Sequence, residues 1–205
     1  MSERFPSIAP DALTHEQKSI HDLLTDQVAR HYGDIFTTHD DTGALVGVFS
    51  QFLYLPASVA TGFSGNVLGL ATISNLSVKC REIAILAVGE HFGASYELYC
   101  HARVAKKAGI PDTQIQDILE GRPPSESNER ELLSWKIARE LVGAGGTFKK
   151  GRLSENLWRS GEEAFGKECL GGLIHFIGFY AYVCITLNAG GILVPHGENI
   201  WPITA

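Results

Sequence analysis

The sequence contains few cysteines, and no two of them lie close together. No pair is separated by only two residues, which excludes a local zinc knuckle and a CxxC redox pair. All of them fall in apolar or helix-like segments and not in a short, loop-rich framework, so free thiols in a reducing compartment are expected. The four positions are Cys80, Cys100, Cys169 and Cys184.

Charged residues are also sparse, at 20% of the 205 residues, and no stripe of basic residues alternates with aromatic ones. The 17 Lys and Arg against 23 Asp and Glu give a net charge of -6, which argues against nucleic acid and anionic membranes as partners. The opening MSERFPSIAPD has no apolar core flanked by basic residues, and no apolar run is expected to span a bilayer. We therefore expect a soluble, cytoplasmic protein.

Apolar residues make up 44% of the chain, enough for one substantial core. Helical spacing recurs throughout and strand-like alternation is hard to find, so an all-α fold is predicted. A capping box of Thr14 and Gln17 predicts the start of a first helix that runs to Gly33. The last predicted helix is apolar on nearly all faces, which places it at the centre of a bundle or in a subunit interface. Further helices are predicted over residues 57–72, 77–91, 95–108, 113–120, 132–141, 153–165 and 169–188.

Two units are predicted along the chain. Residues 1–34 form an N-terminal helical arm, and residues 35–205 form one helical domain. The polar, proline-bearing segment GRPPSESN at 121–128 is predicted to be an internal linker of that domain.

The densest group of reactive side chains lies around Glu97 and His101. These residues are four positions apart, so one helix places the carboxylate and the imidazole on the same face. A carboxylate beside a histidine fixes its tautomer and raises its basicity, giving a unit that exchanges protons near neutral pH. Glu82, on the preceding helix, joins this group only if the two helices fold back as a hairpin. An exposed helical ion pair remains the structural alternative.

Four neighbouring or apolar-helix residues are candidates for substrate binding. Tyr96 is either a core aromatic or a substrate donor, and Cys100 is either a small core residue or part of the site. His175 and Tyr180 belong to the apolar helix 169–188, where they either line a pocket or fill the core. No metal-binding motif is present, so neither a metal nor another cofactor is expected.

The strings REIAIL and YELYCHARVAKKAG resemble the carboxymuconolactone decarboxylase and alkylhydroperoxidase D-like superfamily. The motif comprises Glu82, then Glu97, then His101 with Ala105 and Gly109 in the order HxxxAxxxG. The segments GALVGVFSQFLYLP, with valine where proline is usual, and ERELLSWKIARELV are similar to other parts of the family, so the resemblance covers roughly residues 35–195. It implies an all-helical alkylhydroperoxidase D-like bundle and homo-oligomers, commonly trimers or hexamers, or a dimer, with sites near subunit contacts.

The superfamily has a peroxidase branch and a decarboxylase branch. The peroxidase branch carries CxxCxxxH, whose two thiols would fall at positions 94 and 97 of this chain. Here Ala94 and Glu97 stand there, which removes the attacking and the resolving thiol. The remaining acid–base set resembles the decarboxylase branch, which acts on a carboxylated unsaturated lactone without a cofactor.

This resemblance implies a cofactor-independent lyase with a small-molecule substrate. His101 would donate the proton to the dienolate left by loss of CO2, Glu97 would orient it or act as the alternate base, and Glu82 would relay protons. Arg81 either holds the substrate carboxylate or forms an ion pair elsewhere. Two alternatives stay open: an isomerase, dehydratase or cyclase with the same proton shuttle, and a non-catalytic oligomeric binding protein.

Overall fold

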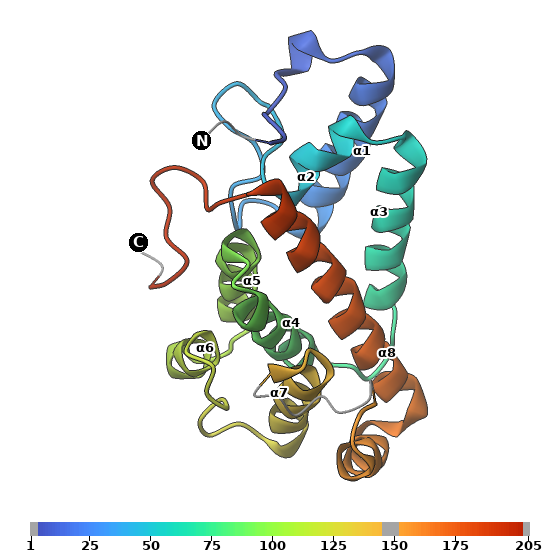
Figure 1. Cartoon of the computed structure of the whole chain (residues 1–205), viewed down its shortest axis with the longest axis vertical. Coiled ribbons are helices and arrows are strands. Elements are labelled where there is room, and N and C mark those ends of the chain that lie inside the picture. Colours follow the sequence, from blue (N-terminus) through green and yellow to red (C-terminus); the bar gives the residue numbers. More distant parts are fainter. Residues whose placement is uncertain (1–3, 145–151, 203–205) are drawn as a thin grey trace.

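The computed structural model describes residues 4–144 and 152–202, and all regular elements within these ranges are helices (Figure 1). One isolated β-bridge joins His39 and Leu45. The all-α prediction is confirmed. The elements are η1 (Pro10–Ala12), α1 (His15–His31), α2 (Val48–Gln51), η2 (Phe52–Tyr54), α3 (Ala57–Ala71), α4 (Val78–Phe92), α5 (Ser95–Lys107), α6 (Asp112–Leu119), α7 (Glu129–Leu141) and α8 (Glu155–Gly190).

Helix α1 begins at the predicted capping box. The Thr14 side chain accepts a hydrogen bond from the Gln17 backbone, and the Gln17 side chain accepts one from the Thr14 backbone. Ile20, Leu24 and Val28 recur every four residues and form one buried face. This face packs toward α3 and η2 and joins the same hydrophobic cluster as the rest of the described chain. The predicted arm is thus fixed over the bundle.

Helix α4 lies at the centre of the bundle and contacts α5, α6, α7 and α8. Ser77 caps its start as predicted, by accepting a hydrogen bond from the Cys80 backbone. The helix ends at Phe92, Gly93 caps it in the left-handed conformation, and the chain returns immediately as α5. Helix α7 comes after the predicted linker at 121–128 yet packs directly on α4, so the core continues across the linker.

Helix α8 runs diagonally through the molecule, between α3 and the α4–α5 pair (Figure 1). Gly166 interrupts it with non-helical backbone angles (φ 73°, ψ 165°), which divides it into the two predicted helices. Contrary to the expectation from sequence, α8 is long and apolar enough, by length and composition alone, to cross a membrane. Half of its apolar window is buried inside the molecule, and a buried core helix meets the same test of length and composition.

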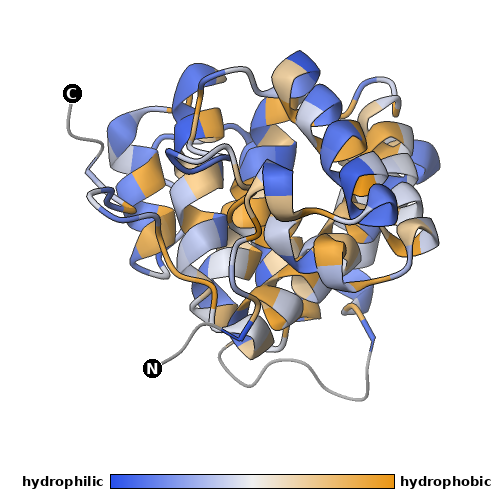
Figure 2. Cartoon of the chain, turned by 90° about the horizontal axis from the view of Figure 1, so that it is seen from above, coloured by the Kyte–Doolittle hydropathy of each residue, from blue (hydrophilic) through white to orange (hydrophobic). Residues whose placement is uncertain are grey.

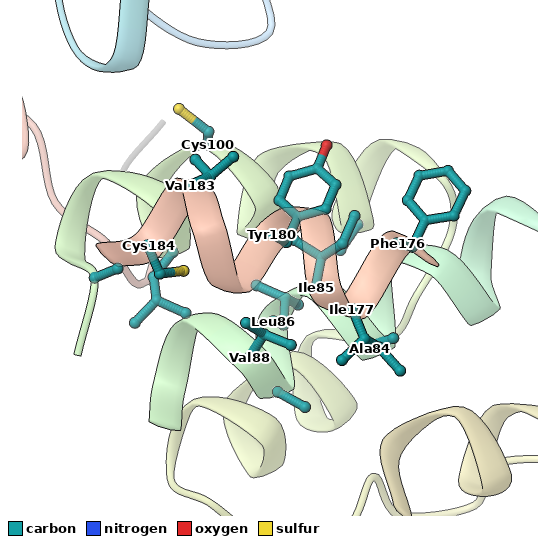
Figure 3. Packing of buried hydrophobic residues seen from close by; sticks show 14 of the residues in the cluster. Ala84, Ile85, Leu86, Val88, Cys100, Phe176, Ile177, Tyr180, Val183 and Cys184 are labelled. Carbon is teal, nitrogen blue, oxygen red and sulfur yellow. The ribbon is translucent and has the colours of Figure 1, made fainter. Parts of the chain in front are cut away.

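Hydropathy follows the packing of the helices. Viewed from above, apolar positions concentrate where helices face one another, and hydrophilic positions lie mainly on outward turns (Figure 2). In the close view, Ile177 of α8 lies on the side of Ala84 in α4, whereas Tyr180 and Cys100 point to the opposite side (Figure 3). That opposite side holds the candidate site.

Candidate active site

Glu82, Glu97 and His101 converge at one buried point. His101 Nδ1 lies 2.7 Å from Glu82 Oε2 in a hydrogen bond, and Nε2 lies 3.1 Å from Glu97 Oε1. The hairpin of α4 and α5 brings Glu82 to the pair that sequence spacing predicts on α5. Each residue is at most 6% exposed, so their charges interact with little screening by water. The three residues predicted to be catalytic are therefore together.

The two carboxylates contact His101 in different ways. Glu82 accepts an aligned hydrogen bond, which fixes the orientation of the ring. Glu97 Oε1 is close to Nε2 but lacks the alignment that a hydrogen bond requires, and it has no other hydrogen-bond partner. Glu82 is thus the orienting partner of His101, and one oxygen of Glu97 is left to bind or exchange a proton.

The surroundings raise the pKa values of both Glu97 and His101. Burial raises the pKa of Glu97 to about 7; the charge of His101 opposes this rise, and that of Glu82 adds to it. Burial alone would lower the pKa of His101, but the charges of Glu82 and Glu97 and the Glu82 hydrogen bond raise it to about 9. Near pH 7, His101 is therefore a cation, and Glu97 exchanges between its acid and its carboxylate form.

Glu97 and His101 line a cavity that is open to solvent, in which the centre of a water-sized sphere can move through about 40 Å³. Helices α1, α2, α3, α5 and α8 contribute to its walls, and none of its described lining residues is a lysine or an arginine. Mostly apolar walls with a few polar groups are typical of sites for small molecules. The apolar part includes Val28, Phe36, Val48, Phe49, Phe63 and Val183.

Tyrosines supply much of the polar lining. Tyr180 packs edge-on against the His101 ring at 4.9 Å and interacts with Tyr32, the residue that follows α1. Burial raises the pKa of both phenols, and the charges of the two glutamates add to this, so both hydroxyls remain protonated. The predicted candidate Tyr180 therefore lies in the cavity wall, beside the proposed proton donor.

Tyr96 also lines the cavity, but its hydroxyl is engaged elsewhere. It donates a hydrogen bond to the Thr37 carbonyl at 3.1 Å. Its ring lies so close to Gly47 that a β-carbon there would overlap it, and Gly47 has the positive φ of 68° that favours glycine. Tyr96 thus holds the segment before α2 in place, which agrees with the core-aromatic alternative.

The other three candidates occupy different environments. Cys100 lines the cavity and is buried, and burial followed by the charge of Glu97 raises the pKa of its thiol well above the usual range. The thiol is therefore neutral and a poor nucleophile. The guanidinium of Arg81 lies over the Phe176 ring at 5.6 Å, outside the cavity lining. His175 is exposed on α8, so the structure does not bring it to the site.

Helix α1 contributes to the site in a way that sequence reasoning misses. Gln27, Val28 and Tyr32 line the cavity, although the sequence predicts a separate arm over residues 1–34. The one available signal is Gln27, a polar residue between Leu24 and Val28 on the edge of an otherwise apolar face. Among the described residues, no three His, Cys, Asp or Glu side chains are grouped so as to hold a metal ion.

Comparison with known proteins identifies the fold. No protein-family model and no curated protein matches the sequence. The structure is similar to the crystal structure of the alkylhydroperoxidase AhpD core, an uncharacterized peroxidase-related protein from Ralstonia eutropha JMP134. The TM-score is 0.71, over 95% of this chain and 93% of that one, at 13% sequence identity. The chain therefore has the alkylhydroperoxidase D-like fold, as the sequence resemblance implies.

Proposed function

We propose that the protein is a cofactor-independent enzyme that moves protons on a small molecule bound beside Glu97 and His101. One observation carries the proposal: a buried His101, oriented by Glu82, stands next to a Glu97 oxygen without a hydrogen-bond partner at the wall of one cavity. Perturbed acid–base groups in an apolar cavity are a signature of proton-transfer sites. The substrate would occupy the space under α1.

Our first candidate reaction is decarboxylation of a small carboxylated lactone or a related cyclic unsaturated acid. The bond to the carboxyl carbon breaks, CO2 leaves, and the electron pair enters the ring as a dienolate. The cationic His101 stabilises the developing oxyanion, and His101 or protonated Glu97 returns one proton to carbon. Apolar walls favour this step because they exclude competing water.

A second candidate is an isomerase, dehydratase or cyclase acting on an uncharged metabolite. The absence of Lys and Arg from the described cavity lining favours it, because a substrate carboxylate would meet two glutamates and only one cation. The same proton shuttle serves these reactions, since each removes a proton at one position and returns it at another.

The site offers no support for thiol peroxidase chemistry. Positions 94 and 97 hold alanine and glutamate, and the nearby Cys100 thiol is buried and neutral. A disulfide cycle needs an ionised attacking thiol and a second thiol in reach. We therefore expect the protein not to reduce peroxides in the presence of a thiol reductant. Such an activity, if Cys100→Ser abolished it, would contradict this expectation.

Proton transfer can be followed in D2O with γ-carboxylated butenolides and matched uncharged butenolides. We expect CO2 release from the former, or deuterium entry into carbon of the latter, and a loss of at least about 100-fold in His101→Ala. Glu97→Gln should lose activity similarly, and His15→Ala, at an exposed histidine on α1, should lose none. Equal activity in His101→Ala and the parent protein would refute the proposal. Inactivity of the parent protein toward both the carboxylated and the uncharged butenolides would also refute it and would favour the alternative of a non-catalytic binding protein.

We also propose a cytoplasmic homo-oligomer. The four buried free cysteines fit a reducing compartment. The interface we propose is the α3–α8 face, defined as Gly62, Leu68, Gly178, Tyr182 and Ile185, all exposed. Neither α3 nor residues 169–190 of α8 contain Lys, Arg, Asp or Glu, so a second copy can approach without charge repulsion.

A further inference from the structure

Two buried oxygens without hydrogen-bond partners line the cavity from different helices. One is Glu97 Oε1 on α5, and the other is Gln27 Oε1 on α1. The other described side chains with such buried atoms, which include Gln51, Arg81 and Trp135, lie outside the cavity lining. Buried polar atoms in native proteins are nearly always hydrogen-bonded, so two open acceptors in one cavity indicate where donors of a ligand belong.

The remaining polar groups of the cavity are largely committed. Tyr32 and Tyr180 interact with each other, the Tyr96 hydroxyl donates to the Thr37 carbonyl, and His101 Nδ1 bonds to Glu82. His101 Nε2 is the one ring nitrogen of this residue that makes no aligned hydrogen bond. A bound molecule therefore meets two acceptors, Gln27 and Glu97, and one donor on His101.

The position of Gln27 is fixed by the core. Its neighbours Leu24 and Val28 are 0% and 2% exposed, and they anchor α1 on the bundle about one turn before and one residue after it. An amide held on a rigid helix positions a ligand with little loss of side-chain freedom. The Gln27 amide is neutral, and the described cavity lining has no Lys or Arg. Gln27 can therefore accept a hydrogen bond from a ligand without adding a charge to the cavity.

We propose that Gln27 is a substrate-positioning residue, and that the site selects an uncharged ring molecule carrying a hydroxyl or another hydrogen-bond donor. The donor bonds to Gln27 Oε1, which leaves Glu97 and His101 to act on the neighbouring atoms of the ring. The reaction after binding rests on the proposed function, but the selection itself is a property of the two open acceptors and can be measured without turnover. It favours the uncharged substrates of the second candidate reaction.

Three probes of nearly equal size separate the possibilities: phenol, which donates a hydrogen bond; anisole, which does not; and benzoate, which is an anion. Affinities are measured by titration calorimetry on the full chain. We expect phenol to bind at least about 5-fold more tightly than anisole or benzoate, as one net hydrogen bond predicts. Equal affinity for phenol and anisole, tighter binding of benzoate, or no saturable binding of phenol would overturn the proposal.

Gln27→Met keeps the length of the side chain and removes the amide. The preference for phenol over anisole should fall to within about 2-fold, while anisole affinity stays unchanged, because only the hydrogen bond to phenol is lost. Gln116→Leu on α6, outside the cavity, should keep the preference. Thermal melting reports whether each variant folds, and Gln27→Leu provides a second apolar replacement if Gln27→Met does not. A retained preference in a folded variant contradicts the role of Gln27.

This binding test is independent of catalysis. If His101→Ala leaves turnover unchanged but Gln27→Met abolishes the phenol preference, the proposed function fails and the binding site stands. If His101→Ala abolishes turnover while the preference survives in Gln27→Met, the function stands and the role of Gln27 fails.

Discussion

Glu97 makes the fold of this protein sensitive to pH at a single residue. Its pKa is about 7 in the fold against an ordinary value of 4.5, so ionisation of Glu97 is less favourable in the native state than in the unfolded chain. Burying the Glu97 charge does not lower the free energy of unfolding below about pH 4.5. As pH rises this free energy falls, and the loss is complete above about pH 7. Glutamine mimics the protonated form at every pH.

Glu97→Gln should therefore gain stability over the parent protein as pH rises. We expect the difference in unfolding free energy between the two to shift by about 3 kcal/mol in favour of the variant from pH 4 to pH 8. Urea unfolding at a series of pH values measures it, with Glu16→Gln at an exposed position of α1 as the control. A difference that does not change with pH would show that Glu97 ionises as freely in the fold as in the unfolded chain.

Glu82 has a separate, measurable effect on His101. The charge of Glu82 and its hydrogen bond help to raise the pKa of His101 to about 9, against the opposing effect of burial. In Glu82→Gln the charge is lost, and the His101 pKa should fall by at least about one unit. An NMR titration of the His101 ring measures the shift directly, and His15, exposed on α1, serves as the internal reference. An unchanged His101 pKa would contradict the orienting role assigned to Glu82.

At the scale of elements, the sequence predicts contacts within a helix better than contacts between helices. The spacing of Glu97 and His101 predicts their proximity because helix geometry alone determines it. The reach of Glu82 depends on the tight return after Gly93, and the placement of Gln27 and Tyr32 depends on how α1 docks on α3. Local periodicity carries no information on either arrangement. The sequence therefore predicts the approach of Glu82 to His101 only on the condition of a hairpin, and it does not predict that Gln27 and Tyr32 line the cavity.

The start of α2 depends on the contact between Gly47 and Tyr96. A β-carbon at Gly47 would overlap the buried Tyr96 ring, and the residue would also be held at a positive φ. Gly47→Ala should lower the free energy of unfolding by about 2–4 kcal/mol. Gly33→Ala is the matched control, because Gly33 has a similar φ of 59° but no atom within 4 Å of an added β-carbon.

Chemical unfolding of both variants separates strain from overlap. Gly33→Ala should lose only the backbone contribution, about 1–2 kcal/mol. In the Tyr96→Ala background, Gly47→Ala should cost no more than Gly33→Ala does, because the overlap is gone. Equal losses for the two single variants would mean that the Tyr96 ring moves aside freely.

For the whole molecule, the sequence predicts the all-α fold but not which surfaces stay uncovered. Residues 169–188 are apolar on nearly all faces, so no pattern distinguishes the side that meets α4 from the side that carries His175, Tyr182 and Ile185. For this reason the sequence does not show that His175 lies outside the cavity lining, where the structure places it. His175 is exposed on a part of α8 that carries no Lys, Arg, Asp or Glu, and the same helix contacts α3 through the rings of Phe179 and Phe63.

That uncharged side leads to a prediction about assembly. Ile185 is 55% exposed and Leu68 is 39% exposed, so burying what remains of each side chain in a second copy is worth about 1 kcal/mol. We expect the parent chain to sediment as a dimer, trimer or hexamer at micromolar concentration. Ile185→Lys and Leu68→Lys should each shift it toward monomer, because a buried unpaired charge opposes association. Leu23→Lys, at a 40% exposed leucine of α1, should leave the oligomer intact. A parent chain that sediments as a monomer, or an oligomer that survives both lysines, would show that the α3–α8 face does not join copies of this protein.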